Sequence, residues 1–202
     1  MDIALKNLIS KVKNLSRGVD NLSVWDIDDT LFVSPKTNVY VTKNGSIVRK
    51  LTTEQFNGYK LKPGEQFDFF EFKDADLFFR TAKPLTGNLK TAKIALQSRN
   101  TMVLILTARS DFNNKDLFLK KFEMYGLDMS KPNIHVVRSG NLGMSTVEGK
   151  RAVLAEVLKA HQFKTASMYD DDMRNLDAFL DIPTEKTSKS AFIAKRGRLF
   201  PY

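Results

Sequence analysis

Several residues that could take part in chemistry lie in one short stretch, VWDIDDTLF (residues 24–32), directly after its apolar start. Asp26, Asp28 and Asp29 come directly after the apolar pair Val24 and Trp25. Burying unpaired carboxylates is costly, so this cluster indicates a site rather than the end of an ordinary core strand. In an extended turn, Asp26 and Asp28 point to the same side of the chain because they lie two residues apart. Asp29 is expected to be structural.

Two later apolar runs, TMVLIL (101–106) and TASMY (165–169), also end in polar residues. These residues are Thr107, Ala108, Arg109, Asp170, Asp171 and Asp172, with Asn175 just beyond. Lys150 lies near the start of the helix that is predicted before the second run. We expect Asn175 either to bond Asp171 or to cap the helix that follows.

This mixture of groups suits phosphoryl transfer. Clustered carboxylates repel one another unless a cation lies among them, and hard oxygen ligands suit Mg²⁺. A hydroxyl, a lysine and free amides at a helix start suit phosphate oxygens. Of two carboxylates on one turn, one can attack while the other transfers protons. The reaction that uses all these groups is phosphoryl transfer to an aspartate.

The predicted elements explain how distant segments could meet. Residues 21–25 are predicted to form a buried strand, and from residue 85 onward helices and strands alternate. The predicted helices are 86–98, 114–126, 147–161 and 173–180, and the strands are 101–106, 134–138 and 165–170, with a final edge strand or hairpin that turns at Arg196-Gly197. This alternation predicts an α/β fold with a Rossmann-like parallel sheet and helices on both faces. Ligands bind at the carboxyl ends of the strands in such sheets.

An insertion and an N-terminal helix complete the expected organisation. Leu5, Leu8, Ile9, Val12 and Leu15 have helical spacing, which predicts a helix within residues 1–16. VYVTKNGSIVRKL, residues 39–51, predicts a β-hairpin that turns at Asn44-Gly45. The aromatic-rich segment after it predicts irregular structure and a short helix. We therefore expect a core of residues 1–32 and 84–202, with a small insertion at 33–83.

Composition limits the partners and the compartment. The 202 residues carry a formal charge of +9 and no cysteine. The charge favours a polyanionic partner, or only good solubility. The lack of cysteine excludes disulfides and thiolate metal sites, and fits a cytoplasmic protein. No signal peptide or membrane-spanning run is visible, so we expect no membrane partner. The oligomeric state stays open.

Four motifs resemble those of one superfamily. Asp26-Ile27-Asp28-Asp29-Thr30 matches the DxDx(T/V) signature of the haloacid dehalogenase (HAD) superfamily of aspartate-nucleophile phosphatases. Thr107 resembles the second motif, Lys150 the third, and Asp170 with Asp171 the acidic fourth. The motifs occur in order and cover about residues 22–180. The chain is also similar to small HAD proteins of tailed phages, and its Thr-Ala-Arg tripeptide to polynucleotide phosphatase domains.

The resemblance implies a role for each matched residue. Asp26 would be the nucleophile, and Asp28 would protonate the leaving group and then activate water. The Asp26 carboxylate, the Asp28 backbone carbonyl and Asp171 would bind Mg²⁺, with Asp170 as a further ligand or a neighbour of one. The implied phosphate ligands are Thr107, Lys150 and Arg109. Thr107 could instead only cap a helix, and Arg109 could form only a surface salt bridge.

The implied function is a Mg²⁺-dependent phosphomonoester hydrolase that forms an aspartyl-phosphate. In this superfamily a small insertion accompanies an open site and large substrates. The insertion mixes aromatic residues with Lys36, Lys43, Arg49, Lys50, Lys60 and Lys62. Such a surface suits a nucleotide or a nucleic-acid terminal phosphate, unless the aromatic residues only form a small core. The alternatives are a sugar-phosphate phosphatase and a non-catalytic HAD-fold binding protein. For a phage protein the expected compartment is the host cytoplasm.

Overall fold

The central feature is a six-stranded sheet, seen in a computed structural model that describes residues 3–14 and 18–202. Within these residues the strand order is β11-β10-β9-β1-β7-β8, and only β10 and β11 pair antiparallel. The strands are β1 (Asn21–Trp25), β7 (Thr101–Thr107), β8 (Ile134–Arg138), β9 (Thr165–Asp170), β10 (Ser188–Lys195) and β11 (Arg198–Pro201). The predicted α/β class with a mostly parallel sheet is confirmed.

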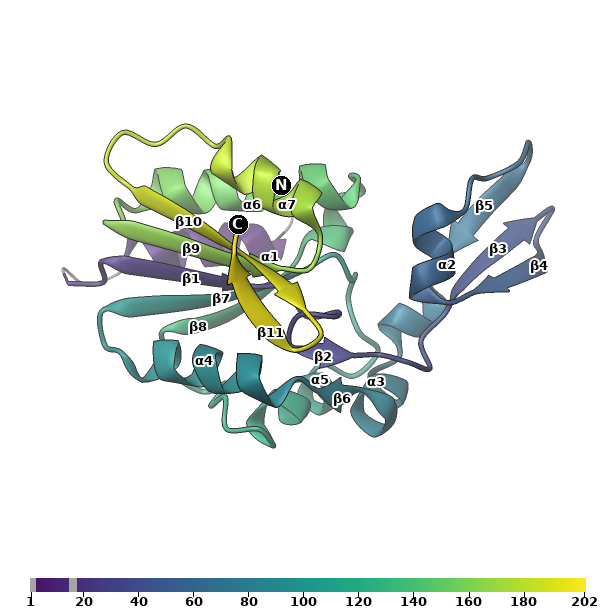
Figure 1. The fold of residues 1–202 in the computed structure, drawn as a ribbon, viewed down its shortest axis with the longest axis horizontal. Coiled ribbons are helices and arrows are strands. Elements are labelled where there is room, and N and C mark those ends of the chain that lie inside the picture. Colours follow the sequence, from purple (N-terminus) through teal and green to yellow (C-terminus); the bar gives the residue numbers. More distant parts are fainter. Residues whose placement is uncertain (1–2, 15–17) are drawn as a thin grey trace.

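Helices cover both faces of this sheet (Figure 1). One face carries α1 (Ile3–Lys13), α6 (Thr146–Ala160) and α7 (Met173–Leu180), and the other carries α3 (Ala75–Thr81), α4 (Thr86–Gln97) and α5 (Lys115–Glu123). The apolar positions predicted for α1 are buried up to Val12, whereas Leu15 and Ser16 lie outside the described residues. No helix in the described ranges is long and apolar enough to span a bilayer.

The β7 strand shows why the sheet is buried on both sides. All seven of its residues are buried. Met102, Leu104 and Leu106 pack into the apolar cluster under α1, α6 and α7, while Val103 and Ile105 pack into the cluster under α4 and α5. Alternate side chains of a strand point to opposite faces, so a continuous apolar run fits a central parallel strand.

The insertion contains more structure than its sequence predicts. The hairpin of β3 (Val39–Lys43) and β4 (Ser46–Leu51) is confirmed, and its turn residues Asn44 and Gly45 have φ angles of 51° and 77°. However, β5 (Glu65–Asp68) adds a third strand where irregular structure was expected, and α2 (Thr53–Gly58) adds a helix between the hairpin and β5. Because β5 is short and pairs with a strand about 25 residues away, its formation depends on tertiary context rather than local pattern.

Only part of the insertion stands away from the core (Figure 1). Its base is closed where β2 (Phe32–Val33) pairs with β6 (Lys83–Pro84). The α3 helix lies within 33–83, yet its buried residues Ala75 and Phe78 belong to the same apolar cluster as α4 and α5. We therefore call residues 39–68, which contain β3, β4, α2 and β5, the outer insertion.

Candidate functional site

The register of the sheet brings the three polar segments to one edge. Trp25 is level with Ile105 of β7 on one side and with Tyr169 of β9 on the other. The next residue, Asp26, donates its backbone N–H to the carbonyl of Tyr169 over 3.0 Å. Asp26 follows β1, while Thr107 ends β7 and Asp170 ends β9. All three therefore lie at the carboxyl edge of the sheet, where α/β sheets bind ligands.

Three carboxylates form a compact group at this edge, which we call the acidic triad. One oxygen each of Asp26, Asp170 and Asp171 lies within 4.8 Å of the others. Asp26 and Asp170 are buried, and Asp171 is exposed. Oxygen donors at this spacing could hold a hard divalent cation.

The ammonium group of Lys150 pairs with two members of the acidic triad. Its Nζ donates to Asp26 Oδ1 over 2.6 Å and to Asp170 Oδ2 over 2.8 Å, and the residue is only 3% exposed. When all three carboxylates are ionised, they and the one ammonium leave two negative charges. The residues present therefore fit a divalent cation in both donor chemistry and charge.

The electrostatics of the triad follow from burial and crowding. Burial raises the pKa of Asp26 well above its ordinary value; Lys150 opposes this shift, and Asp170 and Asp171 reinforce it. Although Asp171 is exposed as a residue, nearby protein atoms remove part of the water around its carboxyl group, which raises its pKa to about 7, with further contributions from Asp170 and Asp29. Burial lowers the pKa of Lys150, but Asp170 and Asp26 outweigh this effect and raise it overall, so Lys150 stays charged.

The aspartates that follow β9 have different tasks. Asp170 Oδ1 accepts hydrogen bonds from the Asp172 N–H and from Asn175 Nδ2, both at 3.0 Å. Asp172 caps α7 by accepting the Arg174 N–H and pairs with the Arg174 side chain. The expectation that Asn175 bonds Asp171 or caps a helix is therefore wrong, because Asn175 bonds Asp170 and Asp172 is the cap.

Asp28 lies outside the acidic triad and has a different cation as its partner. Arg109 Nε and Nη2 donate to its two carboxylate oxygens over 2.8 and 2.6 Å. Arg109 is 3% exposed, so it does not form a surface salt bridge. Asp29 adopts a positive φ of 56° and donates its N–H to the Phe32 carbonyl over 2.7 Å, which shapes the turn.

The loop after β7 is held against a second loop. Thr107 is buried, and its Oγ1 accepts the Arg109 N–H over 3.1 Å, while its carbonyl accepts Ser139 Oγ over 3.0 Å. Ser139 begins the short 3₁₀ turn η2 (Ser139–Leu142). A Cβ on Gly140 would lie 2.3 Å from the Ala108 carbonyl oxygen, so this close approach requires glycine.

Three residues that support the site were not predicted from the sequence. Ser34, Ser139 and Gly140 contact the loops that carry Asp28, Thr107 and Arg109. They stand between 6 and 75 positions from their partners, and no short motif marks them. An exception is Ser34, whose position six residues after Asp28 in the exit from the turn could have indicated it.

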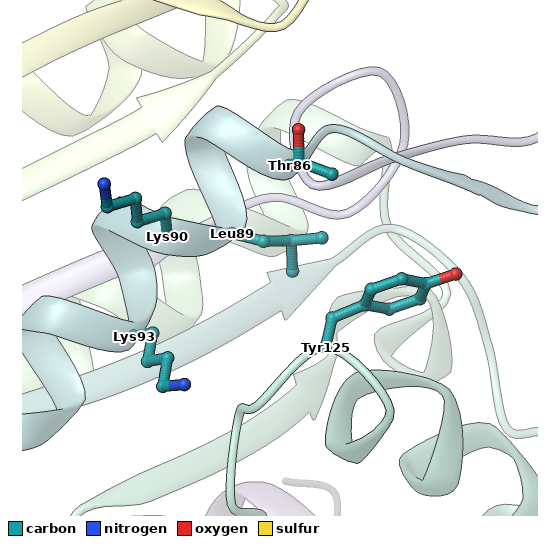
Figure 2. A pocket seen from close by; sticks show the side chains of 5 residues that line it. All are labelled: Thr86, Leu89, Lys90, Lys93 and Tyr125. Atoms are coloured by element: carbon teal, nitrogen blue, oxygen red, sulfur yellow. The ribbon is translucent and has the colours of Figure 1, made fainter.

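A separate pocket lies beside α4 and does not include the predicted site residues. It is lined by Thr86, Leu89, Lys90, Lys93 and Tyr125. Figure 2 shows Lys93 extending from α4 below Leu89 and Tyr125 coming from the segment after α5. We assign no chemistry to it.

No protein-family model matches the chain, and neither a curated protein nor a solved structure shows significant similarity to it.

Proposed function

We propose that the protein is a Mg²⁺-dependent phosphomonoester hydrolase that forms an aspartyl-phosphate on Asp26. The observation that carries this proposal is the acidic triad, in which Lys150 bridges Asp26 and Asp170, with Asp28 two residues from Asp26 on the same turn. The resemblance of the four motifs to those of HAD phosphatases supports it as well.

The proposed reaction has two steps. The Asp26 carboxylate attacks the phosphorus, the bond from phosphorus to the leaving oxygen breaks, and Asp28 gives its proton to that oxygen. Asp28 then takes a proton from water, and the water oxygen attacks the phosphorus. The bond from Asp26 to phosphorus breaks, which releases phosphate and restores the Asp26 carboxylate and the protonated Asp28.

The remaining residues of the site would bind the metal ion and stabilise the negative charge of the phosphoryl group. Asp26, Asp170 and Asp171 would bind Mg²⁺, together with the Asp28 carbonyl that the resemblance implies. The ion would offset the negative charge of the phosphoryl oxygens. Lys150 would orient the Asp26 carboxylate and stabilise the charge that the phosphoryl group adds. Thr107 would contribute at the end of β7.

The outer insertion favours a nucleotide or a nucleic-acid terminal phosphate as substrate. The Arg49 guanidinium lies 5.5 Å from the Tyr59 ring centroid, and the Lys50 Nζ lies 5.6 Å from that of Tyr40. Both cations are exposed. Exposed cations beside aromatic rings suit single-stranded nucleic acid.

The aromatic core that was the alternative explanation is also present. Val39, Val41 and Leu51 pack with Phe56, Tyr59, Phe67 and Phe72. Aromatic residues therefore stabilise the outer insertion whether or not nucleic acid binds. The assignment to a nucleic-acid substrate rests on the cations and on the exposed rings of Phe69 and Phe70, which are 39% and 46% exposed.

The test is phosphate release from a panel of esters, with Mg²⁺ or with EDTA. The panel contains an aryl phosphate, nucleoside monophosphates, sugar phosphates and oligonucleotides with 3′ or 5′ phosphates. We expect Mg²⁺-dependent release that Asp26→Asn abolishes and that Asp116→Asn, at an exposed position on α5, leaves intact.

Each other outcome has a definite meaning. Release that Asp26→Asn does not change would overturn the proposed nucleophile. No release by folded protein that binds Mg²⁺ would favour the non-catalytic alternative. Oligonucleotide hydrolysis should fall steeply with salt, whereas hydrolysis of a sugar phosphate should not.

A further inference from the structure

Arg109 uses its guanidinium on three protein groups rather than directing it toward open solvent. Besides its two bonds to Asp28, its Nη2 donates to Ser34 Oγ over 3.0 Å and its Nη1 donates to the Phe72 carbonyl over 3.2 Å. Ser34 Oγ in turn donates to Asp28 Oδ1 over 3.1 Å. Asp28 thus accepts three hydrogen bonds, two at Oδ1 and one at Oδ2, which together fix its orientation and leave Oδ2 as the oxygen that would carry the transferred proton.

Three aromatic rings lie close to the guanidinium of Arg109. Its carbon lies 4.8 Å from the ring centroid of Phe72, 5.0 Å from that of Phe78 and 5.8 Å from that of Phe112. Buried in this way, Arg109 has little freedom to rotate toward a phosphate. A planar guanidinium that lies over aromatic rings and is paired at two atoms fixes geometry in a way that lysine would not.

The groups that Arg109 contacts lie on both connections between the core and the outer insertion. Ser34 follows β2 on the outgoing connection, and Phe72 lies in the 3₁₀ turn η1 (Phe70–Lys73) on the returning one. The returning connection is also tied to the loop after β7, because the Asn113 N–H donates to the Lys73 carbonyl over 3.1 Å. A displacement of η1 would therefore shift the guanidinium that orients Asp28.

We propose that Arg109 is a positioning residue for Asp28, and that it couples the placement of the insertion to proton transfer. This inference rests on the proposed function, because proton transfer is the role proposed there for Asp28. It replaces the expectation that Arg109 binds the phosphoryl group directly. Through its link to the insertion, Arg109 lets contacts made by the outer insertion affect the alignment of Asp28 with the leaving oxygen.

The dependence of the rate on the leaving group distinguishes the two roles of Arg109. A poor leaving group, such as an alkoxide, needs a proton from Asp28, whereas dinitrophenolate does not. We expect Arg109→Met to lower kcat/KM about 100-fold for an alkyl phosphate and less than about threefold for dinitrophenyl phosphate. If Arg109 instead bound the phosphoryl group, Arg109→Met would lower kcat/KM equally for both substrates, and that result would overturn the proposal.

Two further variants keep the test decisive if Arg109→Met is poorly folded. Ser34→Ala removes one of the three bonds to Asp28, and it should show the same leaving-group dependence with a smaller loss. In an Asp28→Asn background, Arg109→Met should change kcat/KM by less than about threefold, because residues that act through one another are not additive. Additive losses would contradict the positioning role. Arg80→Met, at an exposed position on α3, serves as the control.

Hydrogen exchange tests the coupling without relying on activity. If Arg109 links Asp28 to η1, both Arg109→Met and Asp28→Asn should speed amide exchange in residues 70–73 and leave β8 unchanged. Unchanged exchange in residues 70–73 in both variants would overturn the link, even if the wild-type protein hydrolyses esters. Absence of hydrolysis together with faster exchange would refute only the proposed function.

Discussion

Asp26 and Asp28 lie two residues apart but have different environments. Asp26 is buried against Lys150 and Asp170, whereas Asp28 is partly exposed and paired with Arg109. Two carboxylates in such different surroundings can take different roles in one reaction. The difference is set by residues that are distant in sequence, because Lys150 and Arg109 follow Asp26 by more than 80 positions.

Lys150→Met should destabilise the metal-free protein, because it leaves the buried carboxylates of Asp26 and Asp170 without their cation. We expect a loss of about 3 kcal/mol in the free energy of unfolding at pH 8. The loss should be smaller at pH 5, because without Lys150 the folded state takes up protons on these carboxylates more readily than the unfolded state does. Urea denaturation in EDTA at the two pH values measures both effects.

The control for this variant is Lys159→Met, at an exposed position on the same helix. It should change the free energy of unfolding by less than about 0.5 kcal/mol. A loss for Lys150→Met that is equal at both pH values would contradict the electrostatic explanation and indicate a packing effect alone.

Asp171 should make stability depend on pH in the absence of metal. Its pKa is about 7 in the folded protein against 3.8 for an ordinary aspartate, so the folded state binds more protons between these values. The resulting stabilisation is complete below about pH 4 and is lost as the pH rises through 7. The exposure of Asp171 reduces the size of this effect but keeps its sign.

Asp171→Asn should therefore raise the melting temperature in EDTA at pH 8 and leave it nearly unchanged at pH 4. Mg²⁺ should reverse the order at pH 8, because ligand binding stabilises the wild-type protein more than a variant that lacks one ligand. A lower melting temperature for the variant at pH 8 without metal would show that the carboxylate of Asp171 is not repelled by its neighbours.

The sequence predicts a helix or strand correctly wherever one local residue pattern decides its structure. β8, β9 and α7 begin and end where the sequence predicts. Their signals are strong because β8 is rich in β-branched residues, β9 alternates buried and less buried positions, and α7 is amphipathic. Asn44-Gly45 likewise specifies its own turn. These elements place Asp26, Thr107 and Asp170 at one edge, as the sequence predicts.

The parts that the sequence did not predict depend on contacts between distant residues. β5 is a polar four-residue strand that needs β3 as its partner, and α3 joins the core through Phe78 although it lies in the predicted insertion. Arg109 could be found from its motif, but its contact with the Phe72 carbonyl requires η1 to return to the core. Local periodicity carries no information about these contacts.

Gly140→Ala should disturb the site through the contact between η2 and the loop after β7. The new Cβ would lie 2.3 Å from the Ala108 carbonyl oxygen and 2.9 Å from the Arg109 carbonyl carbon. Because backbone atoms cannot yield as a flexible side chain can, we expect a loss of about 2 kcal/mol in stability. Arg109 should shift with its backbone, so hydrolysis of alkyl phosphates should fall more than that of dinitrophenyl phosphate.

Chemical denaturation and the two-substrate assay check this prediction. Gly58→Ala is the matched control, because no atom lies within 4 Å of a Cβ at that position. It should be nearly neutral in both measurements. A neutral Gly140→Ala would mean that η2 moves away from the site without cost.

The outer insertion has its own small apolar core, formed by Val39, Val41 and Leu51. Its edge strand β4 is exposed from Ser46 to Lys50. Little apolar burial lowers the free energy needed for local opening. We expect amides of residues 39–68 to exchange at least about 100-fold faster than those of β1 and β7, as measured by hydrogen-exchange mass spectrometry. Equal protection would indicate that the insertion unfolds only together with the core.

The net charge of +9 favours polyanions in general, so a specific role for the outer insertion requires a comparison between two places on the molecule. Arg49→Ala with Lys50→Ala removes two exposed cations beside aromatic rings. Lys90→Ala with Lys93→Ala removes the same charge at the pocket of Figure 2.

If a phosphorylated oligonucleotide lies along the outer insertion, the Arg49/Lys50 pair of changes should reduce the slope of log kcat/KM against log salt by about 1. The Lys90/Lys93 pair should change this slope much less, and neither pair should affect hydrolysis of an aryl phosphate. Equal reductions for both pairs would mean that only net charge matters. No reduction for either would favour a small phosphate ester as the substrate, because a small ester makes no contact with residues 39–68.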